Sequence, residues 1–242
     1  MKSSEYWPVT LRLQAPFGLL RLRPLYPKDE AAWKRLRAAN KQWLQPWEAT
    51  SPVPLAKPTL SYKEYLQASN EQAKLGALLP WAIELDGQIV GQVTVASITY
   101  GSLYSASIGY FISEHAAGRG VMPTAVAMAI DYIFTYRQIH RVEINIRPEN
   151  ARSLRVVEKL GLRDEGMRKG YLHINGEWAD HRAFALTREE CPNGLLQRLA
   201  TTWPIADDAK DPSHTRKSAP TLAAFRPWGS SARYRRTRGP RS

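Results

Sequence analysis

Residues 107–136 read SIGYFI, then SEHAAGRG, then VMPTAVAMAIDYIFTY, and their character changes twice. The first six residues have the composition of a strand, and Met122 to Tyr136 have the length and apolar content of a helix with a proline in its first turn. Between the two lies a short basic loop in which Gly118 and Gly120 flank Arg119. A strand, a glycine-rich turn and a helix in this order predict either a plain connection or a cradle for phosphate.

The chemistry of this loop depends on its backbone. The sequence contains no Walker motif, and the third glycine of a dinucleotide fingerprint is missing. Glycines still let neighbouring N–H groups converge on an anion, and the helix that follows adds the positive end of its dipole. The amides concerned are those of Gly118, Arg119, Gly120, Val121 and Met122, and Arg119 adds a full charge. Taken alone, the loop does not separate a phosphate cradle from an ordinary turn.

The periodicity of the remaining sequence predicts a mixed α/β sheet in one domain. Asp86-Gly87 and Asn175-Gly176 separate pairs of apolar runs, which is a strong hairpin signal. Strands are expected at 18–27, 81–98 (two, joined by Asp86-Gly87), 105–112, 140–146, 162–174 and 177–186, and helices at 28–48, 59–76, 122–136 and 150–161. The last helix has Asn150 as its expected N-cap and Gly161 as its stop. This order does not form a regular βαβ repeat.

The composition narrows the environment of the protein. Cys191 is the single cysteine of 242 residues, so no intrachain disulfide can form, which fits a reducing cytoplasm. The N-terminus has no signal-peptide pattern, and no apolar run approaches the roughly 18 residues that span a bilayer. The five histidines show no metal-ligand spacing. We therefore expect a cytoplasmic protein with no bound metal and no membrane contact.

The net charge of +12 predicts attraction to polyanions such as RNA, and half of it lies in the last 42 residues. Residues 201–242 hold nine Lys or Arg and three acids, with a Pro, Gly and Ser content that cannot build a core. We expect a folded domain at 1–200 and a basic, disordered tail at 201–242. The tail could contact RNA or the ribosome, with Trp228 and Tyr234 stacking on bases, or it could be solvated without a specific partner.

A second motif, further along the sequence, bears on the function of the glycine loop. One strand beyond it, residues 147–166 read RPENARSLRVVEKLGLRDEG. The N-x-x-S helix start, the K-L-G stop and the E-G strand resemble the closing half of the GCN5-related N-acetyltransferases (GNAT). The segments YLHING.W.DH and NKQWLQPWE further resemble the ribosomal-protein alanine N-acetyltransferases of the RimJ/RimL type. The resemblance covers about Leu20 to Glu190, and it implies a single α/β domain whose mixed sheet of seven strands is splayed at its centre and flanked by helices.

The resemblance implies acetyl-CoA as co-substrate, without a metal. In the superfamily the pattern [Q/R]-x-x-G-x-[G/A] holds the pyrophosphate through its amides, and two positions depart from it here, Ala117 and Met122. Strand residues are implied to pair with the pantetheine arm, and the helix start to contact the cofactor near the splay. The implied cofactor residues are Phe111, Ile112, Ala117, Gly118, Arg119, Gly120, Val121, Met122, Asn150 and Ser153.

The implied chemistry is direct attack of a neutral amine on the thioester, with a proton donor for the departing thiolate. Many members place a tyrosine seven residues after the asparagine, where this sequence has Val157. Ser153 matches the proton donor of the RimJ/RimL type. Its hydroxyl could instead cap the helix.

The group that takes the proton from the amine is not assigned. The position five residues before Asn150, which is a glutamate in some protein N-terminal acetyltransferases, holds Asn145 and could orient the amine or a water. Glu143 lies on the same strand face by the two-residue period, and a water relay from Glu84 is a further option. We therefore carry Asn145 and Glu143 beside Ser153 as candidate catalytic residues.

The leading hypothesis is an acetyl-CoA-dependent N-acetyltransferase that acts on a protein N-terminal α-amine, such as that of a ribosomal protein. The α-amine has a pKa near 8, so a weak base suffices. A small-amine or antibiotic acetyltransferase is the alternative enzyme, and a ribosome- or RNA-binding protein without turnover is the alternative of another class. Trp43, Trp47 and Tyr171 could wall a peptide groove or simply pack. Oligomeric state does not follow from the sequence.

Overall fold

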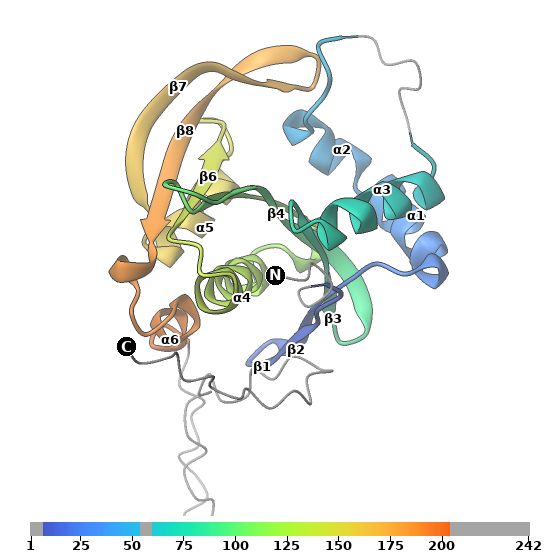
Figure 1. Ribbon diagram of the computed structural model, residues 1–242. Helices are drawn as coiled ribbons and strands as arrows, with labels where there is room; N and C mark the ends of the chain where they lie inside the picture. The colour runs from blue at the N-terminus through green and yellow to red at the C-terminus, as the bar shows by residue number, and fades with distance from the viewer. Residues whose placement is uncertain (1–6, 54–59, 204–242) are drawn as a thin grey trace, which may run out of the picture.

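The protein, seen here in a computed structural model, forms one eight-stranded sheet with helices on both faces (Figure 1). The structure describes residues 7–53 and 60–203. The strand order across the sheet is β1-β2-β3-β4-β5-β6-β8-β7. The strands are β1 (Leu11–Ala15), β2 (Gly18–Arg23), β3 (Leu79–Leu85), β4 (Gln88–Thr99), β5 (Ser105–Ile112), β6 (Arg141–Ile146), β7 (Arg163–Ile174) and β8 (Glu177–Thr187).

The sheet divides at its centre, between β5 and β6. This is its one parallel pair within the described chain, and it pairs only Ser105–Ser107 with Arg141–Glu143. Beyond Ser107, β5 continues to Ile112 along β4, while β6 continues to Ile146 along β8. The two halves therefore separate in a V, as the resemblance implied, and the unpaired edge of β5 faces the opening.

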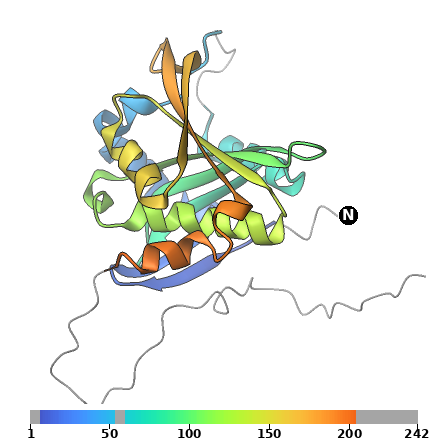
Figure 2. The same ribbon diagram turned by 90° about the vertical axis from the view of Figure 1, so that its left-hand side faces the viewer.

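Helix α4 (Val121–Tyr136) forms the centre of the core beneath the sheet (Figures 1 and 2). Its residues from Val121 to Phe134 are all buried, because β strands, α5 (Ala151–Leu160) and α6 (Leu195–Ala200) enclose it. Asp131 fixes α6 by accepting hydrogen bonds from the amides of Leu195 and Leu196, at 2.7 and 3.0 Å. Since α4 begins at the glycine loop, the packed core holds that loop in place.

The other helices lie on the opposite face, above β3 and β4. The single helix expected at 28–48 is broken at Asn40, where the side-chain amide donates to the carbonyl of Leu36 at 2.8 Å. A side chain that bonds its own preceding turn competes with the helical ladder and ends it. The pieces are η2 (Pro27–Asp29), α1 (Glu30–Ala39), α2 (Lys41–Leu44) and η3 (Gln45–Trp47); α3 (Tyr62–Lys74) follows, with η4 (Glu114–Ala116) and η5 (Arg188–Glu190) elsewhere.

Most of the expected elements are confirmed. Asp86-Gly87 and Asn175-Gly176 form the two tight hairpins, Asn150 caps α5, and Gly161 ends it with a φ of 68°. The expected number of seven strands is wrong, because the apolar alternation of Leu11, Leu13 and Ala15 adds an edge strand before the one at 18–23. Helix α6 was not expected either. The basic tail from residue 204 onward lies outside the described residues.

Candidate functional site

A cleft of about 960 Å³ opens at the splay of the sheet. It begins at α5, passes the glycine loop and the edge of β5, and ends between η3 and β4. The side chains and backbone that line it come from six segments distant in sequence. These are Arg37, Trp43, Leu44, Trp47, Glu48, Ala49, Tyr65, Gln92, Thr94, Gly109, Tyr110, Phe111, Ile112, Glu114, Ala117, Gly118, Gly120, Met122, Pro123, Asn150, Arg152, Ser153, Arg155, Val156 and Lys159.

The glycine loop forms one wall of this cleft. Gly118 and Gly120 have φ angles of 80° and 83°, which side chains with a Cβ rarely adopt. A Cβ on Gly118 would meet no atom within 4 Å, so the loop leaves open space in front of its amides. The first amides of α4 have no acceptor within the helix. The loop therefore has the shape and polarity of an anion cradle.

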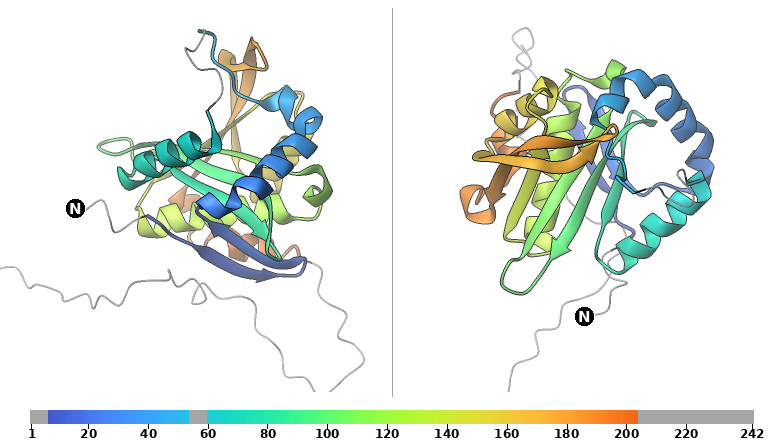
Figure 3. Two further views of the ribbon diagram at one scale, coloured as in Figure 1. Left: turned by 90° about the vertical axis from the view of Figure 1, so that its right-hand side faces the viewer. Right: turned by 90° about the horizontal axis from the view of Figure 1, so that it is seen from above.

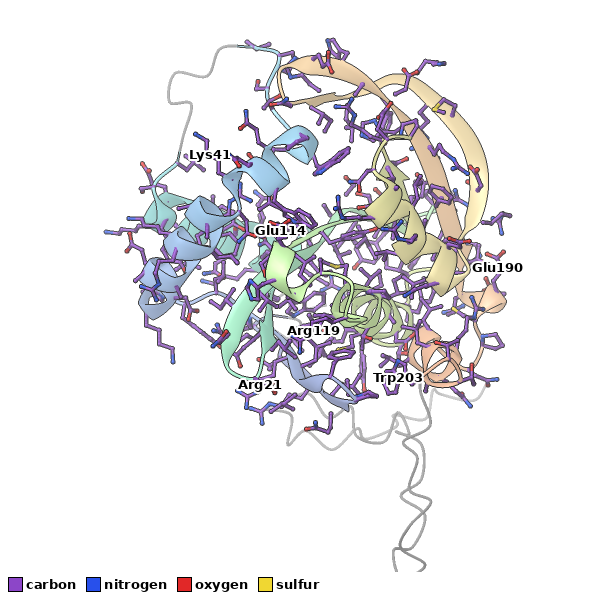
Figure 4. All side chains as sticks on the ribbon, turned by 180° about the vertical axis from the view of Figure 1, so that it is seen from behind. Arg21, Lys41, Glu114, Arg119, Glu190 and Trp203 are labelled. Atoms are coloured by element: carbon purple, nitrogen blue, oxygen red, sulfur yellow. The ribbon has the colours of Figure 1, made fainter. Side chains whose placement is uncertain are left out.

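The structure separates the loop residues by role. Ala117, Gly118, Gly120 and Met122 line the cleft, whereas Val121 is fully buried and offers only its backbone. Arg119 is exposed and is not among the lining residues, so its expected contribution to the cradle is limited to its amide and its charge nearby. Figure 4 shows Glu114 and Arg119 on the segment that joins β5 to α4, near the middle of the molecule.

The free edge of β5 offers a second binding element. Ser113 donates its amide to Val90 of β4, so by antiparallel alternation Phe111 also turns its backbone toward β4, while Tyr110 and Ile112 turn theirs toward the splay. The Trp43 indole N–H donates to the Ile112 carbonyl at 2.9 Å, so the Ile112 amide is the backbone group of this residue that remains for a ligand. Ile112 thus fits the expected role, whereas Phe111 contributes its ring, which contacts Trp33.

Helix α5 adds positive charge to the cradle end. Arg152, Arg155 and Lys159 follow one another at helical spacing, and all three line the cleft. The guanidinium of Arg152 stacks 4.3 Å from the centroid of the Trp43 ring. Exposed cations beside a cradle of amides favour a ligand with several phosphate groups.

The start of α5 separates the two interpretations of Ser153. The cap is made by Asn150, whose side-chain oxygen accepts from the Ser153 amide at 3.1 Å. The Ser153 hydroxyl is therefore not needed as the cap, and it lines the cleft beside Asn150. Opposite it, the Tyr110 hydroxyl donates to the Ser153 carbonyl at 3.4 Å. Burial raises the pKa of Tyr110 well above its usual value, so this phenol stays protonated.

Two of the expected catalytic carboxylates are engaged elsewhere. Glu143 accepts hydrogen bonds from Arg141 and Arg168, at 2.9–3.0 and 2.8 Å. Burial alone would raise its pKa, but these two guanidiniums outweigh it and hold the pKa of Glu143 below its usual value. Glu84 is likewise paired with Arg21 and Arg23. Neither carboxylate lines the cleft.

Asn145 lies on the same face of β6 as Glu143, at the splay. It does not line the cleft, but its side-chain oxygen is buried and has no hydrogen-bond partner within residues 7–53 and 60–203. A buried carbonyl oxygen that accepts no hydrogen bond destabilises the folded protein. A ligand or a water that donates a hydrogen bond to it would therefore bind favourably. Asn145 therefore keeps its expected role as a residue that could orient an amine or a water.

The far end of the cleft is aromatic and carries one ion pair. Of the three residues that could wall a groove or simply pack, Trp43 and Trp47 line the cleft, whereas Tyr171 packs edge-on against His181 outside it. Tyr65 accepts from Gln92 of β4 at 2.6 Å. Glu48 also lines this end, and its carboxylate accepts a hydrogen bond from Arg37. The sequence assigned it no role, and the one signal that could have found it is its place at the end of the segment NKQWLQPWE.

Two further expectations concern metal ions and membranes. No group of three or more His, Cys, Asp or Glu in this part of the chain could hold a metal ion. None of the helices described is long and apolar enough to cross a bilayer.

Comparison with known proteins adds sequence relatives to this geometry. The sequence model of the acetyltransferase (GNAT) domain matches residues 20–163. The [ribosomal protein uS5]-alanine N-acetyltransferase of Escherichia coli (strain K12) is 31% identical over 170 residues, which cover 69% of this chain and 87% of that protein. "Probable N-acetyltransferase YjcK" of Bacillus subtilis (strain 168) is 39% identical over 101 residues, and the match spans 42% of this chain and 56% of that protein.

Among solved structures, RimJ of Mycobacterium smegmatis in complex with CoA-disulfide is similar to this chain throughout the described fold. It superimposes with a TM-score of 0.75 and 39% sequence identity, covering 81% of this chain and 95% of that one.

Proposed function

Because this chain belongs to the GNAT acetyltransferase family, we propose that it transfers an acetyl group from acetyl-CoA to a protein N-terminal α-amine, with a ribosomal protein as the natural acceptor. One observation carries the proposal: the cleft at the splay joins a backbone cradle flanked by cations to an aromatic end that holds a carboxylate. The named activity of the Escherichia coli relative and the CoA-bound Mycobacterium smegmatis neighbour support it.

The cradle and α5 would hold the phosphates of acetyl-CoA. The amides from Gly118 to Met122 would receive the pyrophosphate, and the cations Arg155 and Lys159 would neutralise charge beside it. The free backbone groups of Tyr110 and Ile112 would pair with the amides of the pantetheine arm. This arrangement directs the thioester toward the start of α5, where Asn150 and Ser153 lie.

Bound acetyl-CoA supplies an activated acetyl thioester. The amine nitrogen forms a bond to the acetyl carbonyl carbon and loses a proton to water as the amide forms. The carbon–sulfur bond breaks, and the departing sulfur takes up a proton from a donor that is then reprotonated from water. Ser153 is the proposed donor of that proton, since its hydroxyl lines the cleft and is not used as a cap. The hydrogen bond from Tyr110 to the Ser153 carbonyl positions this first turn of α5.

The amine needs little help to lose its proton. An α-ammonium has a pKa near 8, so an appreciable fraction is neutral near pH 7. Asn145 offers a carbonyl oxygen that could orient the amine or a water. Glu143 is not carried into the mechanism, because Arg141 and Arg168 hold its charge.

The test is acetylation of a peptide library with acetyl-CoA, with release of free CoA as the readout. Peptides that begin with Ala or Ser should be turned over well ahead of polyamines and aminoglycosides. Faster turnover of the small amines would replace the proposal with a small-amine acetyltransferase. Acetyl-CoA binding without turnover of any amine would favour a binding protein that keeps the fold.

We propose a separate role for the basic tail, whose residues from 204 onward lie outside the described part of the chain. Its charge suits electrostatic attachment to RNA on the ribosome, in the cytoplasm where acceptor proteins are made. Deletion of residues 204–242 should abolish salt-sensitive RNA binding and leave peptide acetylation intact. Unchanged RNA binding in the deletion variant would contradict the tether.

A further inference from the structure

We propose that Glu48 anchors the α-ammonium of the acceptor, and that a clasp between residues 48–50 and the β7–β8 hairpin holds it there. The inference rests on the proposed function, since it names a residue that selects the acceptor. It concerns the end of the cleft opposite the glycine loop.

Charge singles out Glu48. Among the described residues that line the cleft, the carboxylates are Glu48 and Glu114. Glu114 belongs to the cradle end, where its amide donates to the side chain of Asn40 at 2.8 Å, two residues before Ala116 and the glycine loop. Glu48 is thus the carboxylate at the end that an acceptor would enter. A cationic amine that leaves water needs such a partner.

The carboxylate of Glu48 is oriented but not fully used. One of its oxygens accepts from Arg37, whose guanidinium also lies 5.1 Å above the Phe111 ring. The other oxygen has no hydrogen-bond partner in the described part of the chain. An oxygen held in place by a neighbouring ion pair and still open to the cleft is available to an N–H donor.

Aromatic walls make this position selective. Trp43 and Trp47 line the cleft on one side of Glu48, and Tyr65 lines it from α3. Arg152 stacks on Trp43 and Arg147 lies 6.0 Å from the Trp47 ring, which fixes the two indoles. Flat apolar walls around a carboxylate favour a small cationic group on an extended chain over a bulky or neutral one.

The clasp ties Glu48 to the far half of the sheet. The Glu48 carbonyl accepts from the Asn175 amide at 2.9 Å, and the Thr50 amide donates to the His173 carbonyl at 2.9 Å. The Thr50 hydroxyl accepts from the Gly176 amide at 3.0 Å and lies 2.8 Å from Nδ1 of His173. The right panel of Figure 3 shows the hairpin tip reaching over to the segment after η3.

This clasp bridges the two sides of the splay at the acceptor end. The chain between Trp47 and Thr50 therefore crosses from the helices α1 and α2 to the hairpin, with Ala49 paired to Ile174. An acceptor that enters beside it must present a thin chain end rather than a side chain on a folded surface. The clasp and the carboxylate thus select for the same ligand, a free N-terminus.

The test is a double-mutant cycle between protein and peptide. Binding of an Ala-initial peptide and of the same peptide acetylated at its N-terminus is measured by calorimetry on CoA-saturated wild type and Glu48→Gln. The free-amine peptide should bind about tenfold more weakly to Glu48→Gln, since the contact is partly exposed. The acetylated peptide has no ammonium and should bind both proteins alike. Equal losses for the two peptides, or no loss for either, would overturn the anchor.

Two matched variants complete the test. Thr50→Val removes only the hydroxyl of the clasp and should weaken the free-amine peptide by roughly threefold, whereas Glu30→Gln removes a carboxylate that pairs with Lys34 outside the cleft and should change nothing. Steady-state kinetics should show the Glu48→Gln loss in the KM for peptide, with the affinity for acetyl-CoA unchanged. Absence of peptide turnover by the wild type would refute the proposed function, while the binding cycle would still decide the anchor.

Discussion

The two ends of the cleft are built in different ways. At the cradle end, one continuous segment from Ala117 to Met122 supplies backbone amides, and the core around α4 holds it rigid. At the acceptor end, side chains from α1, η3, α3 and β4 converge, and hydrogen bonds between Thr50 and the hairpin keep them together. A site made of backbone is sensitive to backbone conformation, whereas a site made of side chains is sensitive to single functional groups.

The largest effect is expected from Gly118→Asp. The variant places a side chain and a negative charge in front of the cradle amides, at a φ of 80° that only glycine adopts readily. We expect the Kd for acetyl-CoA to rise at least about a hundredfold, as measured by calorimetry. Gly101→Asp is the matched control, because Gly101 has a φ of 75° and also meets no atom within 4 Å, but lies in the β4–β5 loop. Similar losses in both variants would mean that strain, not the cradle, causes the effect.

Ser153→Ala tests the point where the two ends meet. Loss of a proton donor should lower kcat by about thirtyfold, with the Kd for acetyl-CoA changed less than about twofold. Helical content and melting temperature should stay unchanged, since Asn150 makes the cap. Ser102→Ala, on the exposed β4–β5 turn, serves as the control. An unchanged kcat would remove Ser153 from the chemistry and leave the proton to water.

Asn40→Ala tests the connection between the ends. The Asn40 side chain is buried and links the end of α1 to Glu114, directly before the glycine loop. Its loss leaves the part-buried Glu114 amide without this acceptor, while the Leu36 carbonyl keeps the Asn40 backbone amide at 3.2 Å, and it should cost about 2 kcal/mol of unfolding free energy. The corresponding fall in melting temperature is about 4–8 °C in a calorimetric scan. Asn193→Ala, at an exposed turn, should have little effect, and equal stability of the two variants would show that the ends are independent.

The smallest effect is expected from the cations of α5. The double variant Arg155→Gln, Lys159→Gln should raise the Kd for acetyl-CoA about tenfold at low salt, and by less at high salt, because exposed charges are screened. Peptide affinity should stay unchanged, since these residues lie at the cradle end. Arg188→Gln, outside the cleft, is the control. A loss that does not depend on ionic strength would assign these residues a packing role instead.

The same contrast explains which residues could be predicted. The cradle was predictable, because its glycines, its strand and its helix are neighbours in the sequence and each leaves a local signal. The cap at Asn150 and the hairpins at Asp86 and Asn175 were predictable for the same reason. The family resemblance, matched at Asn150, implied that Asn145 and Ser153 lie near the splay, and their catalytic roles stay predictions.

Other features depended on contacts that no local pattern encodes. Glu143 lies on the same strand face as Asn145, yet Arg168, 25 residues away, pairs with its carboxylate. The resemblance named both Phe111 and Ile112 as cofactor residues, and only the register with β4 shows that Phe111 turns its backbone toward the sheet. The segment NKQWLQPWE contains Glu48 but indicates no role for it. The position of Glu48 depends on the clasp, which joins residues more than 120 apart in the sequence.

The sequence by itself determined most of the order of elements, the glycine loop between β5 and α4 and the charge of this protein, since these follow from periodicity, glycine conformation and composition. Tertiary structure alone decided the acceptor end, the four ion pairs that engage Glu84 and Glu143, and the free edge of β5. The physical reason is range: backbone propensities act over a few residues, whereas the electrostatics of a side chain depend on whichever distant groups the fold brings within hydrogen-bond distance.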